Sequence, residues 1–305
     1  MALHIHTPLI ESLPLSKACG ARCWIKLDAL QPSGSFKLRG IGAACEAYRA
    51  RGARRFVSSS GGNAGIAVAY AGRQLGTPVT VVVPASTTQR ARGLITELGA
   101  ELVVHGATWQ EANAFAQLLM GTEDAFLHPF DDPLLWSGHA TLIEEIAAAG
   151  LTPDAVVLSV GGGGLLSGVA EGLRRTGMRD TCIVAVETEG AASYRAALQA
   201  GHPAELDRIT SIATSLGAKQ VCAQAVKVAS ERSVRSAVVS DGDAARACMQ
   251  FLEDHRVLVE PACGAALAPG YAANAVLDGF KEIVFVACGG VTSTLDQVRG
   301  WSLSL

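Results

Sequence analysis

The segment QPSGSFKLRG, residues 31–40, carries a lysine directly after a tight turn. Its proline and glycine predict the turn, and the residues that follow predict the beginning of a helix. Only six lysines occur among the 305 residues, and Lys37 follows Phe36 at this junction. A lysine amine with a lowered pKa can attack a carbonyl carbon, whereas an ordinary lysine is a solvated surface charge. The segment alone does not choose between these two roles.

A glycine run in SVGGGGLLSG, residues 159–168, suits an anion. Four successive glycines let backbone N–H groups turn inward, and the helix expected after them adds its positive N-terminal end. This pattern predicts a phosphate site. No lysine stands at the Walker position, so the segment is not a P-loop.

A second glycine segment, SSSGGNAG at residues 58–65, adds hydroxyl groups and one amide side chain to a helix N-terminus. Free N–H groups there suit a carboxylate, and Asn63 can hydrogen-bond a neighbouring oxygen. The simpler explanation is N-capping of a helix that starts at Ala64. Taken together, a phosphate site, a carboxylate site and a lysine after a turn call for a phosphate-bearing aldehyde and an amino acid. Pyridoxal phosphate is such an aldehyde, and it forms a Schiff base with a lysine amine.

These segments must be positioned by alternating strands and helices. Apolar, β-branched runs predict strands at residues 54–60, 77–84, 100–106, 154–160, 181–187 and 282–290. Between them, apolar residues at helical spacing predict helices within 63–76, 87–99, 108–120 and 165–177. Continuously apolar strands that alternate with helices indicate parallel sheets covered on both faces. The predicted fold class is therefore α/β. Three of the strands end at a glycine pair, where a ligand can approach the backbone closely.

A dinucleotide site is the alternative from another reaction class. Gly162-x-Gly164-x-x-Ser167 matches the fingerprint loosely, since its third glycine is absent. Glu187 ends the next predicted strand, where a ribose-binding acid would stand. This alternative predicts a nicotinamide-dependent dehydrogenase.

Composition excludes several classes of partner. A net charge of −3 gives no basic excess for nucleic acid or for an anionic membrane surface. No apolar run reaches spanning length, and the first residues lack the order of a signal peptide. Eight scattered cysteines without Cys-x-x-Cys spacing indicate reduced thiols in a cytoplasmic protein. The histidines form no metal-ligand pattern.

Several segments together resemble a known family. The chain is similar to the catabolic L-serine/L-threonine dehydratases, which are pyridoxal-phosphate enzymes of the tryptophan synthase β-like class, also called fold type II. The resemblance runs through essentially the whole chain and is densest in five segments: LDALQPSGSFKLRGIG, SSSGGNAG, PFDDPLLWSGHA, LSVGGGGLLSGV and VLVEPACGAALA. It implies two open-sheet α/β domains and β-elimination of L-serine to pyruvate and ammonia, and of L-threonine to 2-oxobutanoate and ammonia.

The resemblance also implies roles for individual residues. Lys37 would hold the cofactor as a Schiff base, with Phe36 against one face of the ring and Cys288 beside the pyridine nitrogen. The cofactor phosphate would bind at Gly161, Gly162, Gly163, Gly164 and Leu165. The substrate carboxylate would bind at Ser60, Gly61, Asn63 and Ala64, and Asn63 would also reach the ring hydroxyl. A monovalent cation, expected to be potassium, would lie at Glu187 and at carbonyls near Ala191, Leu216 and Ala218.

Two residues depart from the pattern of well-known members. Gly61 stands where they carry alanine, which resembles a variant branch, and the missing methyl is expected to loosen the carboxylate loop. Ser215 stands where alanine usually packs against the other face of the ring. Both departures affect turnover and substrate preference rather than the class of reaction.

The PFDDPLLW segment predicts a domain boundary. We expect a large cofactor-binding domain from residues 1–41 and 135–305, and a small domain from residues 42–134 that carries the carboxylate loop. The resemblance implies a homodimer. A β-replacement enzyme, an amino-acid racemase and a non-catalytic binding protein remain open as alternatives. No regulatory domain is expected after the catalytic core.

Overall fold

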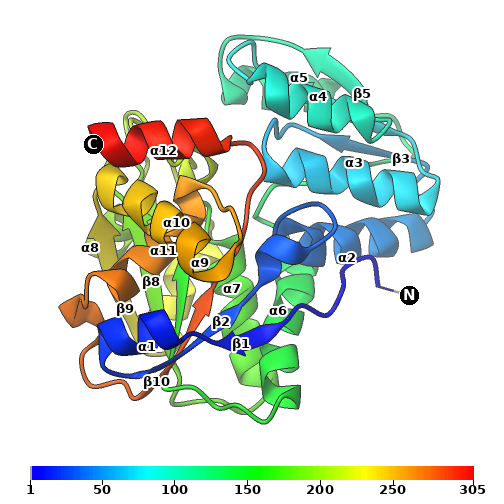
Figure 1. Ribbon diagram of the computed structural model, residues 1–305. Coiled ribbons are helices and arrows are strands. Elements are labelled where there is room, and N and C mark those ends of the chain that lie inside the picture. Colours follow the sequence, from blue (N-terminus) through cyan, green and yellow to red (C-terminus); the bar gives the residue numbers. More distant parts are fainter. Residues whose placement is uncertain (1) are drawn as a thin grey trace.

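Residues 2–305 are described by a computed structural model, in which two β-sheets are covered by helices (Figure 1). The strands are β1 (Leu9–Glu11), β2 (Arg22–Lys26), β3 (Arg55–Ser58), β4 (Val79–Val83), β5 (Glu101–Val104), β6 (Asp124–Phe126), β7 (Ala155–Ser159), β8 (Cys182–Thr188), β9 (Val234–Val239) and β10 (Glu282–Val286). The helices are α1 (Leu13–Cys19), α2 (Lys37–Ala50), α3 (Asn63–Leu75), α4 (Gln89–Glu97), α5 (Trp109–Leu118), α6 (Pro133–Ala148), α7 (Gly164–Arg175), α8 (Ser193–Ala200), α9 (Ala223–Glu231), α10 (Asp241–His255), α11 (Pro261–Tyr271) and α12 (Leu295–Ser304). Short 3₁₀ turns are η1 (Asp28–Leu30), η2 (Thr214–Leu216) and η3 (Ala275–Leu277).

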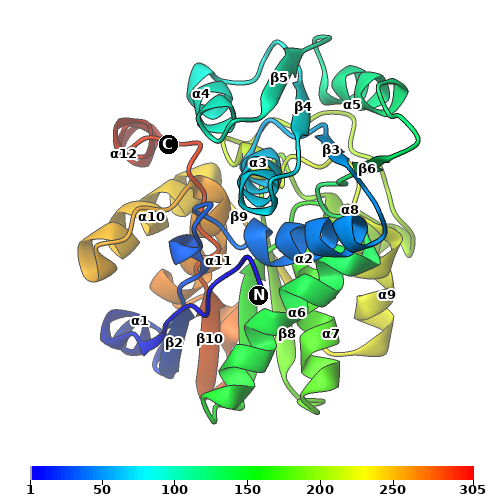
Figure 2. The same cartoon turned by 90° about the vertical axis from the view of Figure 1, so that its right-hand side faces the viewer.

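The larger sheet has six strands in the order β1-β2-β10-β7-β8-β9. β1 is antiparallel to β2, and every other neighbouring pair is parallel. All residues of β7 and β8 are buried, as a parallel sheet covered on both faces requires. Figure 2 shows α1, α10 and α11 on one side of this sheet and α6, α7 and α9 on the other.

The smaller sheet has four parallel strands in the order β5-β4-β3-β6. Side chains alternate between its two faces: Phe56 and Val81 join one apolar cluster, whereas Val57 and Val82 join another with Ala112 of α5. The smaller sheet is therefore also covered by helices on both faces, with α5 on one and α3 on the other.

The structure confirms the α/β class and the six predicted strands. Most strand ends differ from the predicted ones by one or two residues. The strand predicted at 282–290 is the exception, because it ends at Val286 and a loop follows. The four predicted helices are present as α3, α4, α5 and α7. β1, β2, β6 and β9 were not predicted, and three to six residues of mixed burial give too little period to read.

The two predicted domain boundaries fall inside helices. The first, between residues 41 and 42, lies in α2, and the second, between residues 134 and 135, lies in α6. The proline-rich segment starts α6 rather than a linker, because Pro133 occupies the first turn and the Asp132 side chain accepts a hydrogen bond from the Leu134 N–H. α2 and α6 pack on each other between the two sheets.

No helix within the described residues is long and apolar enough to cross a membrane.

Candidate active site

Lys37 is the first residue of α2, and its amine is partly buried. Nζ donates a hydrogen bond of 2.7 Å to the carbonyl of Pro129 and lies 5.1 Å from the centre of the Phe36 ring. Burial lowers the pKa of this amine from the ordinary 10.5 to about 8, although Cys288, Cys222 and Glu260 act in the opposite direction. A substantial fraction of the amine is therefore neutral near physiological pH.

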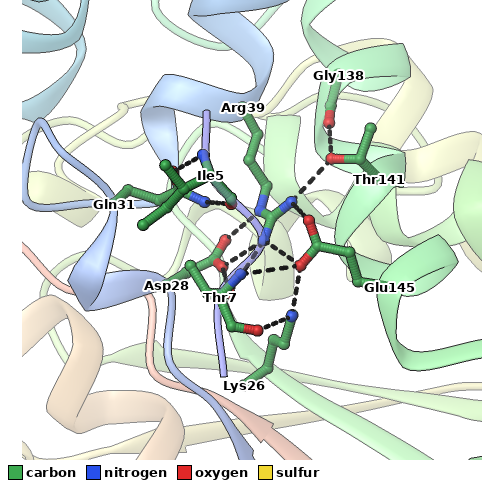
Figure 3. Close-up of polar contacts among 9 residues, drawn as sticks. All are labelled: Ile5, Thr7, Lys26, Asp28, Gln31, Arg39, Gly138, Thr141 and Glu145. Carbon is green, nitrogen blue, oxygen red and sulfur yellow. Dashed lines mark hydrogen bonds and ion pairs between the residues drawn. The ribbon is translucent and has the colours of Figure 1, made fainter. Parts of the chain in front are cut away.

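Two residues further along α2, Arg39 anchors the helix in a buried polar cluster (Figure 3). Its guanidinium binds both oxygens of Asp28, at 2.7 and 2.9 Å, and both oxygens of Glu145, at 2.6 and 2.8 Å. Lys26 on β2 donates to Glu145 and to the carbonyl of Thr7. Two cations thus meet two carboxylates, so the cluster is neutral, and it ties α2 to α6 and to β2. This cluster therefore fixes the start of α2 and, with it, the turn that carries Lys37.

The glycine run connects β7 to α7, which begins at Gly164 without a side-chain cap. Gly163 adopts a φ of 89°, in the left-handed region that favours glycine. A Cβ on Gly162 would overlap the ring of Phe130, and one on Gly164 would lie 2.7 Å from the carbonyl of Phe130. The loop therefore requires glycine, and the first-turn N–H groups of α7 remain available for an anion.

The second glycine segment leads from β3 into α3, which begins at Asn63 rather than at Ala64. Its N-cap residue is Gly62, and no side chain caps the helix. The N-capping explanation is therefore wrong, because Asn63 lies inside the first turn and its side chain points elsewhere. As at α7, uncapped N–H groups are left at the end of a helix.

Asn63 joins the two sheets. Its Nδ2 donates to Oε1 of Glu260 at 2.6 Å and to Oγ of Ser215 at 3.3 Å. Its Oδ1 accepts from the N–H of Val291 at 3.2 Å. A Cβ on Gly161 would lie 3.0 Å from Cα of Leu216, so the phosphate loop lies against η2, which carries Ser215. The loops after β3, β7 and β10 are therefore linked through Asn63 and Ser215.

Cys288 lies just past the end of β10. Its Sγ is 3.7 Å from Oγ of Ser159 at the end of β7, and its carbonyl accepts from the N–H of Phe36 at 3.0 Å. Contact with the Cys263 thiol and burial raise the pKa of Cys288 well above its ordinary value, so the thiol is neutral. Cys288 is thus held next to the turn that carries Lys37.

Glu187, at the end of β8, is fully buried. Its carboxylate accepts hydrogen bonds from the N–H groups of Tyr194 at 2.7 Å and Arg195 at 2.8 Å, at the start of α8. Burial raises the pKa of Glu187 to about 7, while these two N–H groups act in the opposite direction. The two N–H groups account for an acid at this position, so a ribose is not needed to explain it. The cation assignment for Glu187, Ala191, Leu216 and Ala218 stays a prediction.

Gly61 does not leave the gap expected from a missing methyl. A Cβ there would lie 2.6 Å from Oγ1 and 2.8 Å from Cγ2 of Thr87. The Thr87 side chain therefore fills the space that an alanine methyl would occupy. The carboxylate loop is packed against Thr87 at this point, and the expected looser hold on the substrate stays a prediction.

Two buried residues near the site escaped the sequence analysis. Glu260 binds Asn63 and Thr292, and His139 lies 5.0 Å from the Phe36 ring with no hydrogen-bond partner for either ring nitrogen among residues 2–305. The sequence signal for Glu260 is an acid between apolar residues in VLVEPAC. His139 gave no usable signal, because one histidine on an apolar helix face is ordinarily a core residue.

Comparison with known proteins decides the family. The model of the family described as "Pyridoxal-phosphate dependent enzyme" matches residues 2–289. The chain belongs to this family.

Within the family, the chain is similar to serine dehydratases. It is 46% identical to a mouse (Mus musculus) serine dehydratase-like protein, covering 99% of this chain and 95% of that protein. It is 44% identical to the human (Homo sapiens) L-serine dehydratase/L-threonine deaminase, covering 97% of this chain and 94% of that protein. The crystal structure of an L-serine ammonia-lyase from the fungus Rhizomucor miehei superposes with a TM-score of 0.94 at 34% identity, covering 100% of this chain and 99% of that one. Two parallel-sheet domains of fold type II are thereby established, and the dehydrogenase interpretation is abandoned.

The residues present fit the family's cofactor. An aldehyde needs an amine that is not committed to a carboxylate, and within residues 2–305 the hydrogen bond of the Lys37 amine goes to a carbonyl. A phosphate needs free N–H groups, and α7 offers them behind a loop in which a Cβ at any of four successive glycines would meet neighbouring atoms. A neutral thiol can lie beside a pyridine nitrogen that carries no proton, and the Cys288 thiol is neutral.

Proposed function

We propose that this chain is an L-serine/L-threonine ammonia-lyase, which converts L-serine to pyruvate and ammonia and L-threonine to 2-oxobutanoate and ammonia. The observation that carries the proposal is the Lys37 amine, which has a lowered pKa and lies next to Cys288 in a chain similar to serine dehydratases over its whole length. The similarity to a fungal L-serine ammonia-lyase supports the same reaction.

Lys37 carries the proton chemistry in this proposal. When bound, pyridoxal phosphate supplies an electron-withdrawing ring that stabilises negative charge at the substrate Cα. Lys37 would hold the cofactor through Nζ, and the same atom, when free and neutral, would accept the Cα proton of the substrate. A pKa of about 8 suits an amine that must be neutral when it accepts this proton.

The other site residues bind and orient. The phosphate binds to the N–H groups from Gly161 to Leu165, and Phe36 packs against the ring. The substrate carboxylate binds at the start of α3, at Ser60, Gly61, Asn63 and Ala64. Since this helix end is uncapped, its N–H groups fix the carboxylate and thereby the direction of the Cα–H bond. Ser215 contacts the Asn63 amide and would face the side of the ring opposite Phe36.

Five finer assignments belong to the same proposal. A potassium ion binds at Glu187 and at the carbonyls of Ala191, Leu216 and Ala218. The protein is a homodimer in the cytoplasm, and it acts on a free amino acid. The small domain comprises residues 42–134, in agreement with the span of the four-stranded sheet from Arg55 to Phe126.

The test is keto-acid release by the purified protein with pyridoxal phosphate and potassium. We expect pyruvate from L-serine and 2-oxobutanoate from L-threonine, with lower rates when lithium replaces potassium. Lys37→Ala should lower the rate at least ~10³-fold, within the range for loss of a proton-transfer group. Lys227→Ala, which removes an exposed lysine on α9, should leave it unchanged.

Three other outcomes would overturn the proposal. Formation of D-serine without keto acid would indicate a racemase. Dependence on an added thiol would indicate β-replacement. A parent that binds the cofactor and converts no amino acid would indicate a binding protein.

A further inference from the structure

Glu260 is a buried carboxylate that the proposed chemistry does not use. It is 4% exposed and precedes α11, yet its side chain does not cap that helix. Within residues 2–305 it forms no ion pair; its carboxylate contacts Asn63 through Oε1 and Thr292 through Oε2, at 2.6 and 2.8 Å. A buried acid whose contacts are neutral donors is costly, so its position calls for an explanation.

The surrounding chain is shaped to hold this carboxylate. Gly290 adopts a φ of 116°, and a Cβ there would overlap the carboxyl group of Glu260. Burial raises the pKa of Glu260, while Ser215, Thr292 and Asn63 lower it as hydrogen-bond donors. The loop after β10 thus leaves space for the acid and also supplies the Thr292 hydroxyl that binds it.

The main consequence of Glu260 is the orientation of the Asn63 amide. Oε1 of Glu260 accepts from the amide nitrogen of Asn63, so the amide oxygen faces the N–H of Val291 and accepts from it. The second hydrogen on Nδ2 is then directed toward Ser215. Rotation of the amide by half a turn would set its oxygen against the carboxylate oxygen of Glu260.

We propose that Glu260 is a positioning residue that sets the orientation of the Asn63 amide across the two domains, and so determines how the site receives the cofactor ring hydroxyl and the substrate carboxylate. Asn63 belongs to the small domain, whereas Glu260, Ser215 and Val291 belong to the large one. The contact therefore joins the small domain to the large domain. This inference rests on the proposed role of Asn63.

A double-mutant cycle tests the proposal. The dissociation constant of pyridoxal phosphate is measured with apoprotein carrying Asn63→Ala, Glu260→Ala, or both, and KM for L-serine is measured in parallel. Glu260→Ala should weaken cofactor binding about tenfold, the factor for loss of one hydrogen bond to a charged group. In the Asn63→Ala background the same change should alter the constant less than twofold. Glu260→Gln should restore most of the affinity, because its amide oxygen can still accept from Asn63.

A matched control separates positioning from stability. Thr80→Val removes another buried hydroxyl that donates to a glutamate, at 2.8 Å from Glu101 and within β4. It should lower the melting temperature without changing cofactor affinity. If Glu260→Ala does not fold, Glu260→Asp takes its place in the cycle, since the shortened side chain draws its carboxylate back from Asn63.

Additive effects of the two alanine substitutions would overturn the proposal, as would unchanged cofactor affinity in Glu260→Ala. The dissociation constants of the cycle are measured without substrate, so they are independent of turnover, unlike the parallel KM. A parent that binds pyridoxal phosphate but releases no keto acid would refute the ammonia-lyase proposal alone. An active parent with an additive cycle would refute the role of Glu260 alone.

Discussion

At the scale of single residues, the site depends on groups that are left without their usual partners. Lys37 has a carbonyl neighbour where a surface lysine would have water or a carboxylate, and α3 and α7 begin without side-chain caps. Each of these groups is costly in the folded chain. In the proposed site, an aldehyde, a phosphate and a carboxylate would offset this cost on binding, which is the physical basis for assigning the three groups to one site.

The lowered pKa of Lys37 predicts the pH dependence of cofactor capture. Only the neutral amine attacks the aldehyde, so the second-order rate constant for pyridoxal phosphate incorporation should rise with pH and level off above about 8. An amine with the ordinary pKa would still be gaining rate near pH 10. Stopped-flow absorbance of the apoprotein between pH 6 and 10 measures the midpoint, and a midpoint near 10 would contradict burial as the cause.

Gly162 gives a second residue-scale prediction. Gly162→Ala should weaken pyridoxal phosphate binding at least ~10-fold, because the new methyl overlaps the Phe130 ring and forces the phosphate loop away from its position. Gly93→Ala is the control, since a Cβ there meets nothing within 4 Å and α4 should gain about 0.5–1 kcal/mol. Equilibrium titration of both apoproteins provides the comparison. Equal affinities would mean that Phe130 moves freely out of the way.

At the scale of elements, α2 and α6 connect the catalytic turn to the rest of the molecule. Arg39 on α2 and Glu145 on α6 meet in the buried cluster with Asp28 and Lys26. Burial would raise the pKa of Glu145, but hydrogen bonds and charge from Arg39 and Lys26 outweigh it and lower the pKa to about 2. Glu145 therefore remains charged over the whole physiological pH range.

Removal of Arg39 should be strongly destabilising. Arg39→Met leaves two buried carboxylates facing a single lysine, and breaking a buried ion pair in this way costs about 3–5 kcal/mol. Arg54→Met removes one exposed ion pair with Glu123 and should cost less than about 1 kcal/mol. Urea unfolding followed by circular dichroism measures both. A loss from Arg39→Met as small as that from Arg54→Met would mean that the cluster contributes little.

At the scale of the whole molecule, the site is formed where two separate sheets present the carboxyl ends of their strands to each other. The lysine turn packs on the loop after β10, the phosphate loop follows β7, and the carboxylate loop follows β3 in the other sheet. The loop after β10 binds both domains, because the carbonyl of Val291 also accepts from Nε of Arg90 on α4. Movement of one domain relative to the other would therefore open the site.

The proposed homodimer is tested by sedimentation equilibrium. The purified holoprotein should sediment at twice the mass of the 31.5 kDa chain over the micromolar range. A single species of chain mass with full keto-acid release would show that one chain suffices for the site.

The sequence by itself determined the α/β class, the strand and helix positions with strong periodicity, and the segments that carry Lys37 and the glycine loops. These features are local: a run of β-branched residues or a glycine before a helix predicts its own conformation. It did not reveal β1, β2, β6 and β9, whose short runs of mixed burial have little period of their own.

Only the tertiary structure decided which side chains meet. Asn63 and Glu260 are 197 positions apart, and no spacing rule joins them. The Thr87 side chain fills the space that a methyl at Gly61 would occupy, and no sequence pattern places Thr87 there. α2 and α6 continue through the two predicted boundaries. The buried ion pair between Arg39 and Glu145 holds these two helices together. Contacts of this kind depend on how distant segments pack, and packing is a property of the folded chain rather than of any segment within it.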